Sequence, residues 1–179
     1  MLSARELSIP WGNDHLHWSW KSIPQSRFSE VTELRTTTWL EIHGKIDARN
    51  LSPKTNYAAY LVYKIEDRAY GFNSIPAEML VQVGSHVSSS IGYIQKDSKK
   101  LALENMCFLN RMEMLKARVI KGHEKVPRDR EDGWKEIELG EFYIDVGNEG
   151  EVKMSFMEIK GEHLKGGLVL EGFEIRPKH

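Results

Sequence analysis

The sequence has little cysteine and no long apolar run. Its 179 residues include one cysteine, Cys107, so no disulfide can form within the chain, and a reducing compartment is expected. Cys107 lies in an apolar run, which predicts a buried thiol and leaves an exposed, cross-linking thiol as the alternative. No segment approaches the roughly 18 apolar residues of a membrane span, and the first residues lack the apolar core of a signal peptide. The sequence therefore predicts a cytoplasmic, non-secretory protein without membrane association.

Neither sign of charge is in excess, and common enzyme signatures are missing. The 25 basic and 26 acidic side chains give a formal net charge of -1, which disfavours RNA as a partner. There is no G-x-S-x-G elbow, no P-loop and no dinucleotide-binding glycine motif. His15 and His17 have no evident third ligand, and one cysteine is too few for a thiolate zinc site. No cofactor and no metal are predicted.

Alternation of apolar and polar residues is the dominant pattern, and it is typical of strands with one buried face. Residues 55–65 differ in being apolar on both parities, as in a central strand covered on both sides. The predicted strands cover residues 39–46, 55–65, 134–146, 151–160 and 167–176. The turn at 147–150 predicts that 134–146 and 151–160 form a β-hairpin. The fold class expected is all-β, a single-domain, jelly-roll-like antiparallel β-sandwich.

The segment from about 84 to 130 has no clear period. Residues 85–90 are polar and are expected to form a loop. Residues 101–121 fit either a short helix or two further strands, and this alternative stays open. The charged segment 125–132 is expected to be an exposed loop.

Three of the five tryptophans fall within ten residues near the N-terminus. Trp11, Trp18 and Trp20 are interleaved with polar residues such as Asn13. Turn-forming residues flank Trp11 and predict an exposed position. An indole face matches the C–H face of a sugar ring, and its N–H can donate to a sugar oxygen. Trp18 and Trp20 share a strand face, so they form either a stacking platform or an anchor to the core.

Glutamates are candidate site residues because two carboxylates at a sugar site suggest a glycosidase. Glu158 shares parity with Val152 and Phe156, so it should face their apolar side and needs a partner or a ligand. Glu136 and Glu138 are expected about 7 Å apart on the solvated face of one strand. No second carboxylate is fixed as the partner of Glu158.

Several blocks of the sequence resemble the phloem protein 2 family, which includes the tobacco lectin Nictaba, with cucurbit phloem lectins as the nearest likeness. The matching blocks are residues 4–11, 17–20, 39–46, 57–62, 132–142, 150–152, 157–159 and 172–177. They imply one lectin domain over residues 1–179, with a divergent insertion at about 84–130. Lys99 and Lys100 only faintly echo the nuclear-targeting cluster of Nictaba, so nuclear entry is not expected.

The resemblance implies a non-enzymatic, homodimeric lectin in the cytoplasm of phloem sap. Its ligands would be N-acetylglucosamine oligomers (chitooligosaccharides) and the chitobiose core of N-glycans on glycoproteins. The ligand-binding residues that the resemblance implies are Trp11, Trp18, Glu151 and Glu158. Their neighbours Trp20 and Asn13 complete the expected site. The alternatives are a protein- or RNA-interaction module of phloem sap and, less favoured, a glycosidase.

Overall fold

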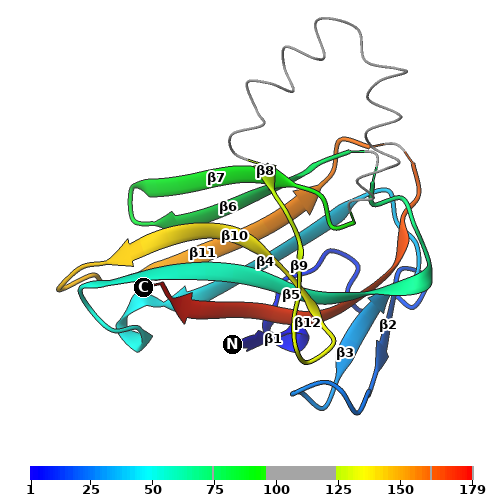
Figure 1. The fold of residues 1–179 in the computed structure, drawn as a ribbon, viewed down its shortest axis with the longest axis horizontal. Coiled ribbons are helices and arrows are strands. Elements are labelled where there is room, and N and C mark those ends of the chain that lie inside the picture. Colours follow the sequence, from blue (N-terminus) through cyan, green and yellow to red (C-terminus); the bar gives the residue numbers. More distant parts are fainter. Residues whose placement is uncertain (74, 96–123, 162, 179) are drawn as a thin grey trace, which may run out of the picture.

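Two β-sheets pack face to face in the computed structural model, which describes residues 1–73, 75–95, 124–161 and 163–178 (Figure 1). The seven-stranded sheet consists of β1 (Leu2–Ser3), β2 (Trp18–Lys21), β3 (Val31–Leu34), β5 (Thr55–Tyr70), β9 (Arg128–Asp129), β10 (Lys135–Ile144) and β12 (Gly166–Pro177). The five-stranded sheet consists of β4 (Leu40–Asp47), β6 (Ala77–Val83), β7 (His86–Gly92), β8 (Glu124–Lys125) and β11 (Glu151–Glu158). Two 3-10 turns, η1 (Ala4–Glu6) and η2 (Ala48–Asn50), complete the described elements.

The all-β, jelly-roll-like antiparallel sandwich predicted from the sequence is confirmed. The strand order is β2-β3-β12-β5-β10-β9 in one sheet, with β1 beside β12, and β4-β11-β6-β7-β8 in the other. The short β7–β8 pair is parallel, whereas the other strand pairs of the described residues are antiparallel.

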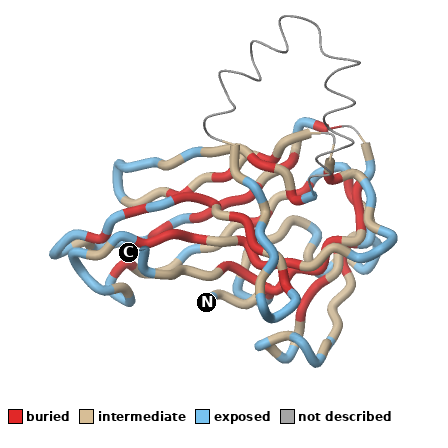
Figure 2. The backbone as a smooth tube through the Cα atoms, in the orientation of Figure 1, coloured by how far each residue is buried: buried red, intermediate tan, exposed pale blue. Residues whose placement is uncertain are grey.

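The core lies between the two sheets, where the buried segments of both sheets face each other (Figure 2). Strand β5 contributes Leu61 and Tyr63 to this core, each fully buried. Val62, on the opposite face of β5, packs with Trp134 and Val169 in a second, smaller cluster on the outer side of the seven-stranded sheet. The prediction that residues 55–65 form a strand covered on both sides is therefore confirmed.

The predicted hairpin of residues 134–146 and 151–160 is wrong. Strand β10 pairs with β5 and β9, whereas β11 pairs with β4 and β6, so the chain passes from one sheet to the other at residues 147–150. Both strands carry an apolar face, and placing them in opposite sheets buries those faces against each other.

The polar segment 85–90, expected to be a loop, forms most of β7. Small hydroxyl side chains suit a strand that lies close to β10. The Ser90 hydroxyl donates a hydrogen bond of 3.2 Å to the Leu139 carbonyl, and a Cβ on Gly140 would approach the Ser88 hydroxyl at 3.1 Å.

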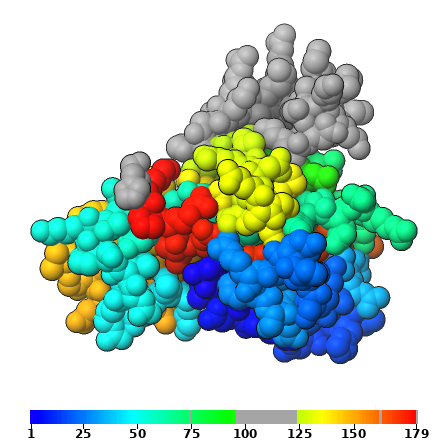
Figure 3. Space-filling model, turned by 60° about the horizontal axis from the view of Figure 1, so that its bottom comes forward, coloured from blue at the N-terminus to red at the C-terminus, as the bar shows by residue number. Residues whose placement is uncertain are grey.

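The segment 125–132, also expected to be a loop, contributes β9 and half of β8. Figure 3 shows this part of the chain (yellow) lying over the molecule between the N-terminal portion (blue) and the C-terminal strand (red). The expectations for Cys107 and for residues 101–121 concern positions outside the described residues.

The N-terminal segment extends the edge of the five-stranded sheet. Ser8 and His43 form an antiparallel bridge, with backbone hydrogen bonds of 2.8 and 2.9 Å in the two directions. This pairing attaches the tryptophan-rich turn that follows Ser8 to β4.

Candidate functional site

Trp11 lies in a tight turn and is exposed. The Gly12 amide donates to the Ile9 carbonyl at 3.0 Å, and the Asp14 amide donates to the Trp11 carbonyl at 2.9 Å. Trp11 itself has φ 58°, and 51% of its surface is exposed. A bulky residue with positive φ is uncommon because its Cβ crowds the backbone. The exposure expected from the flanking turn residues is confirmed.

Trp18 and Trp20 face the core from β2, as their shared parity indicated. Trp18 is only 2% exposed, so its indole belongs to the core and offers no surface for stacking. Trp20 is half-buried, and its Nε1 donates to the Gly12 carbonyl at 2.8 Å. The Arg5 guanidinium carbon lies 3.6 Å from the centroid of the Trp20 ring. Trp20 thus supports the turn that displays Trp11, while its own face is covered.

The rest of the turn is anchored by hydrogen bonds. His17 Nδ1 lies 2.9 Å from the Thr36 carbonyl, and the His17 carbonyl accepts from the Arg35 amide at 2.7 Å. The His17 ring is tilted against that of Trp11, with 5.5 Å between the centroids. Asn13 is exposed at the tip of the turn. Trp11 and His17 therefore lie together at the surface on a backbone held by hydrogen bonds, and Asn13 is exposed in the same turn.

Glu158 faces the apolar side of β11, as its parity predicted, and is 2% exposed. The fully buried Lys165 ammonium lies 3.6 Å from Glu158 Oε1 and donates to the Thr38 carbonyl at 3.0 Å. His163 Nε2 lies 3.8 Å from the same oxygen. Burial raises the pKa of Glu158 to about 7, outweighing the attraction of Lys165. This carboxyl is closed off from solvent, and its partner Lys165 links the end of β11 to residue 38.

Glu151 lies at the opposite end of β11 from Glu158. Seven residue steps of extended chain separate the two, about 23 Å. Glu151 is exposed and pairs with Lys45 at 3.2 Å. The two carboxylates implied by the family resemblance therefore do not meet at one sugar.

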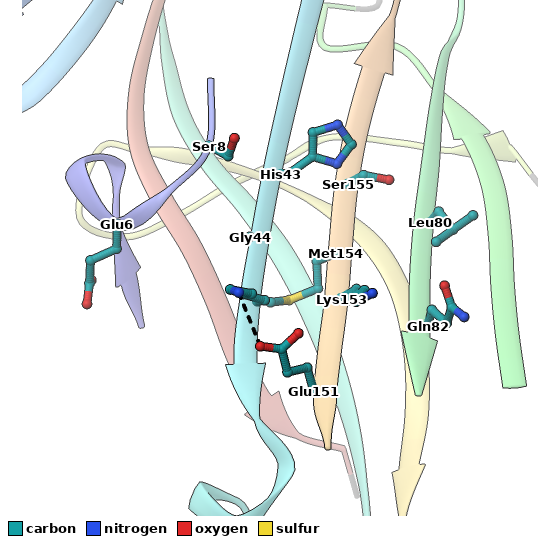
Figure 4. A pocket seen from close by; sticks show the side chains of 11 residues that line it. Glu6, Ser8, His43, Gly44, Leu80, Gln82, Glu151, Lys153, Met154 and Ser155 are labelled. Carbon is teal, nitrogen blue, oxygen red and sulfur yellow. Dashed lines mark ion pairs between the residues drawn. The ribbon is translucent and has the colours of Figure 1, made fainter. Parts of the chain in front are cut away.

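Glu151 instead borders a hollow of about 460 Å³ on the outer face of the five-stranded sheet (Figure 4). We call this feature the sheet-face hollow. Figure 4 shows β4, β11 and β6 forming its floor, with the N-terminal segment along one side. It is lined by Glu6, Ser8, His43, Gly44, Lys45, Leu80, Gln82, Glu151, Lys153, Met154 and Ser155. The alternation in each strand indicates which side chains point outward, but it does not predict that they border a common hollow.

Glu136 and Glu138 are ion-paired rather than solvated as expected. Glu136 is 7% exposed and accepts from Arg176 at 2.8 and 2.9 Å, while Glu138 accepts from Lys125 at 2.8 Å. These pairs hold the pKa of both carboxyls below the usual range against the opposing effect of burial. Both point outward from the seven-stranded sheet, because the intervening Ile137 is buried in the core. Glu158 faces inward from the other sheet, so the carboxylate pair considered for a glycosidase is not assembled.

Among the described residues, no group of three or more His, Cys, Asp or Glu side chains is arranged to hold a metal ion. The same residues contain no helix long and apolar enough to cross a membrane.

Comparison with known proteins identifies the family. A family model described as Phloem protein 2 matches residues 1–177. Similar Arabidopsis thaliana proteins are F-box protein PP2-B15, 44% identical over 99% of this chain and 64% of its own length, and F-box protein VBF, 42% identical over 99% and 65%. The chain thus spans slightly less than two thirds of the length of these relatives. The chain belongs to the phloem protein 2 family.

Proposed function

We propose that the protein is a non-enzymatic carbohydrate-binding domain that recognises N-acetylglucosamine oligomers, including the chitobiose core of N-glycans. The observation that carries this proposal is the Trp11 indole, half exposed on a left-handed backbone. Such a conformation costs of order 1–3 kcal/mol in a residue with a Cβ. Glycine or asparagine would fit the turn at lower cost. The retention of an exposed indole at that cost supports a binding role for it.

The surrounding side chains suit a sugar ring lying on Trp11. The indole face packs against the C–H face of a pyranose, while the Asn13 amide both donates and accepts hydrogen bonds. The His17 ring lies beside Trp11, held by the contact of its Nδ1 with the Thr36 carbonyl, and its Nε2 lies 3.9 Å from the Asp14 carboxylate. The contacts of Trp20 with Gly12 and Arg5 hold the turn before ligand arrives, which reduces the entropy lost on binding.

A shallow site of this kind leaves much of the sugar in water. The expected dissociation constant per site is micromolar to millimolar, which corresponds to a binding free energy of roughly 4–8 kcal/mol. A homodimer, which the family resemblance implies, would raise the avidity for multivalent N-glycans without new contacts. The proposed location is the cytoplasm of phloem cells.

The test is calorimetric titration with chitotriose of wild type and Trp11→Asn, with cellotriose as the ligand control. Asparagine tolerates the left-handed backbone, so this change removes the indole without new strain. Removing a central aromatic anchor costs about 2 kcal/mol of binding free energy, so we expect binding to weaken about thirtyfold. Leu16→Ala, which removes the 74%-exposed apolar side chain of the same loop, is the matched control. Equal affinity of wild type and Trp11→Asn contradicts the assignment of Trp11.

Binding of a protein partner is a second candidate, favoured by the longer relatives that carry F-box names. The two functions are distinguished by capturing a glycoprotein with this domain before and after its N-glycans are removed enzymatically. Sugar recognition predicts that capture is lost and that free chitotriose competes. Protein recognition predicts that capture is unchanged. The net charge of -1 weighs against RNA as the partner.

A further inference from the structure

Three side chains on the outer face of the five-stranded sheet are locked together by hydrogen bonds. Trp39, just before β4, is 43% exposed, and its Nε1 donates to Glu41 Oε2 at 2.8 Å. The second oxygen, Oε1, lies 2.5 Å from His43 Nε2. We call Trp39, Glu41 and His43 the β4 row, because their equal parity places them on one face of that strand.

The β4 row holds an indole in one orientation at the surface. One carboxylate bridges the tryptophan N–H and the histidine ring, so neither ring turns without breaking a charge-assisted bond. The Thr37 hydroxyl further fixes the backbone, since it accepts from the Trp39 amide at 3.0 Å and donates to the Trp39 carbonyl at 3.0 Å. An exposed aromatic ring with this much support has little conformational entropy left to lose on binding.

The β4 row continues directly into the sheet-face hollow. His43 lines the hollow, and it is paired across the strands with Ser155 of β11. Farther along β4, Lys45 and Glu151 form the ion pair at the other end of the hollow (Figure 4). From Trp39 to Lys45 the strand covers about 20 Å, so the surface is elongated rather than a single pocket.

Charged groups of both signs are interspersed on this surface. Lys45 pairs with Glu151, and Lys160 pairs with Glu78 at the neighbouring strand. Glu6 and Lys153 also line the hollow, so neither sign forms a patch that would select an ionic ligand. Closely spaced donors and acceptors beside an exposed indole instead match a neutral, polyhydroxylated chain.

We propose that the β4 row and the sheet-face hollow form an extended oligosaccharide subsite, in which a pyranose stacks on Trp39 and further units lie along the hollow. This inference rests on the proposed function. Ser8 and His43 pair in an antiparallel bridge, so the chain after Ser8 and the chain before His43 lie toward the same end of β4. Trp11 follows Ser8 and Trp39 precedes His43, so both lie toward that end. The two indoles are therefore separate contact points toward one end of β4.

The experiment compares chitobiose, chitotriose and chitotetraose by calorimetry on the whole chain. We expect wild type to gain affinity with length and Trp39→Ala to lose about thirtyfold for chitotetraose. Trp39→Phe keeps a ring but loses the N–H bond to Glu41, so its affinity should lie between the two. Tyr143→Ala, which removes a 46%-exposed aromatic of the other sheet, is the matched control and should bind as wild type does.

A second readout follows the indole directly. The five tryptophans give five indole N–H signals in a heteronuclear NMR spectrum, and Trp39→Phe assigns one of them. Chitotetraose should shift that signal in wild type. If wild type binds while the Trp39 variants match it and the assigned signal stays in place, the extended subsite is refuted and the proposed function stands. If wild type binds none of the oligomers, both proposals fail.

Discussion

Replacement of Glu158 by glutamine should change how the stability of the protein depends on pH. Glu158 is buried beside Lys165, and burial raises its pKa from 4.5 to about 7. Glutamine has nearly the shape of the protonated carboxyl and carries no charge. The variant therefore lacks the one titration that distinguishes folded from unfolded chain at this position.

The sign of the effect follows from proton uptake. In the unfolded chain the carboxyl ionises near 4.5, whereas in the folded chain it keeps its proton until about pH 7. Between these values folding takes up a proton, so the free energy of unfolding of wild type falls as pH rises. The interval corresponds to about 3 kcal/mol at 1.36 kcal/mol per pKa unit. Below about pH 4.5 and above about pH 7 this contribution is constant.

The measurement is urea unfolding followed by tryptophan fluorescence between pH 4 and pH 8. The difference in the free energy of unfolding between Glu158→Gln and wild type should shift by about 3 kcal/mol in favour of the variant between pH 4 and pH 8. Glu151→Gln, at the exposed end of the same strand, controls for general charge effects. A difference that is independent of pH would show that the attraction of Lys165 balances burial, and one that favours wild type more as pH rises would show that it outweighs burial. Either result would refute the reasoning.

Two further substitutions separate folding from recognition. Trp18→Ala should lower the free energy of unfolding by about 3–5 kcal/mol, measured in urea, because it empties a buried indole site in the core. An unchanged stability would contradict the placement of Trp18. Gly172→Ala should cost about 1–3 kcal/mol, because a Cβ there would meet the Leu2 carbonyl oxygen at 1.9 Å. Faster amide exchange at Leu2 and Ser3 would report the displacement of β1, and protection equal to that of wild type would contradict it.

Local periodicity was sufficient to find the long strands. The segments that form β4, β5 and β12 either alternate between apolar and polar residues or are apolar throughout. Each pattern is visible within the segment itself, without knowledge of its partners. The partners of a strand are not local. Residues 134–146 and 151–160 looked like a hairpin because only four residues join them, but each pairs with strands of a different sheet that are distant in the sequence. The serine-rich β7 was missed because its strand character comes from fitting closely against β10.

The same limit applies to the site. Turn chemistry correctly predicted that Trp11 is exposed, since glycine and asparagine follow it directly. Parity showed that Trp18 and Trp20 share a face, but parity alone does not say which face is covered. The β4 row was readable as an alternation, yet its continuation into a hollow depends on β11 and β6 lying beside β4, which is a long-range contact.

The two outer faces of the sandwich differ in a way that directs binding to one of them. Part of the outer side of the seven-stranded sheet is covered by the cluster around Trp134, whose Nε1 donates to the Gln25 carbonyl at 3.0 Å. A second hollow of about 320 Å³ lies on the same side, and most of the residues that line it are charged. Beside that cluster, Arg130 contacts both Glu136 and Glu174 at 2.9 and 2.7 Å, so the polar groups there are used within the fold. The five-stranded sheet presents a half-exposed indole together with side chains that border a hollow. At the hollow of the other sheet, the Arg176 guanidinium covers the ring of Tyr60. A neutral ligand that needs an uncovered aromatic face beside a hollow therefore meets both on the five-stranded side, and we expect binding to respond to variants of that face.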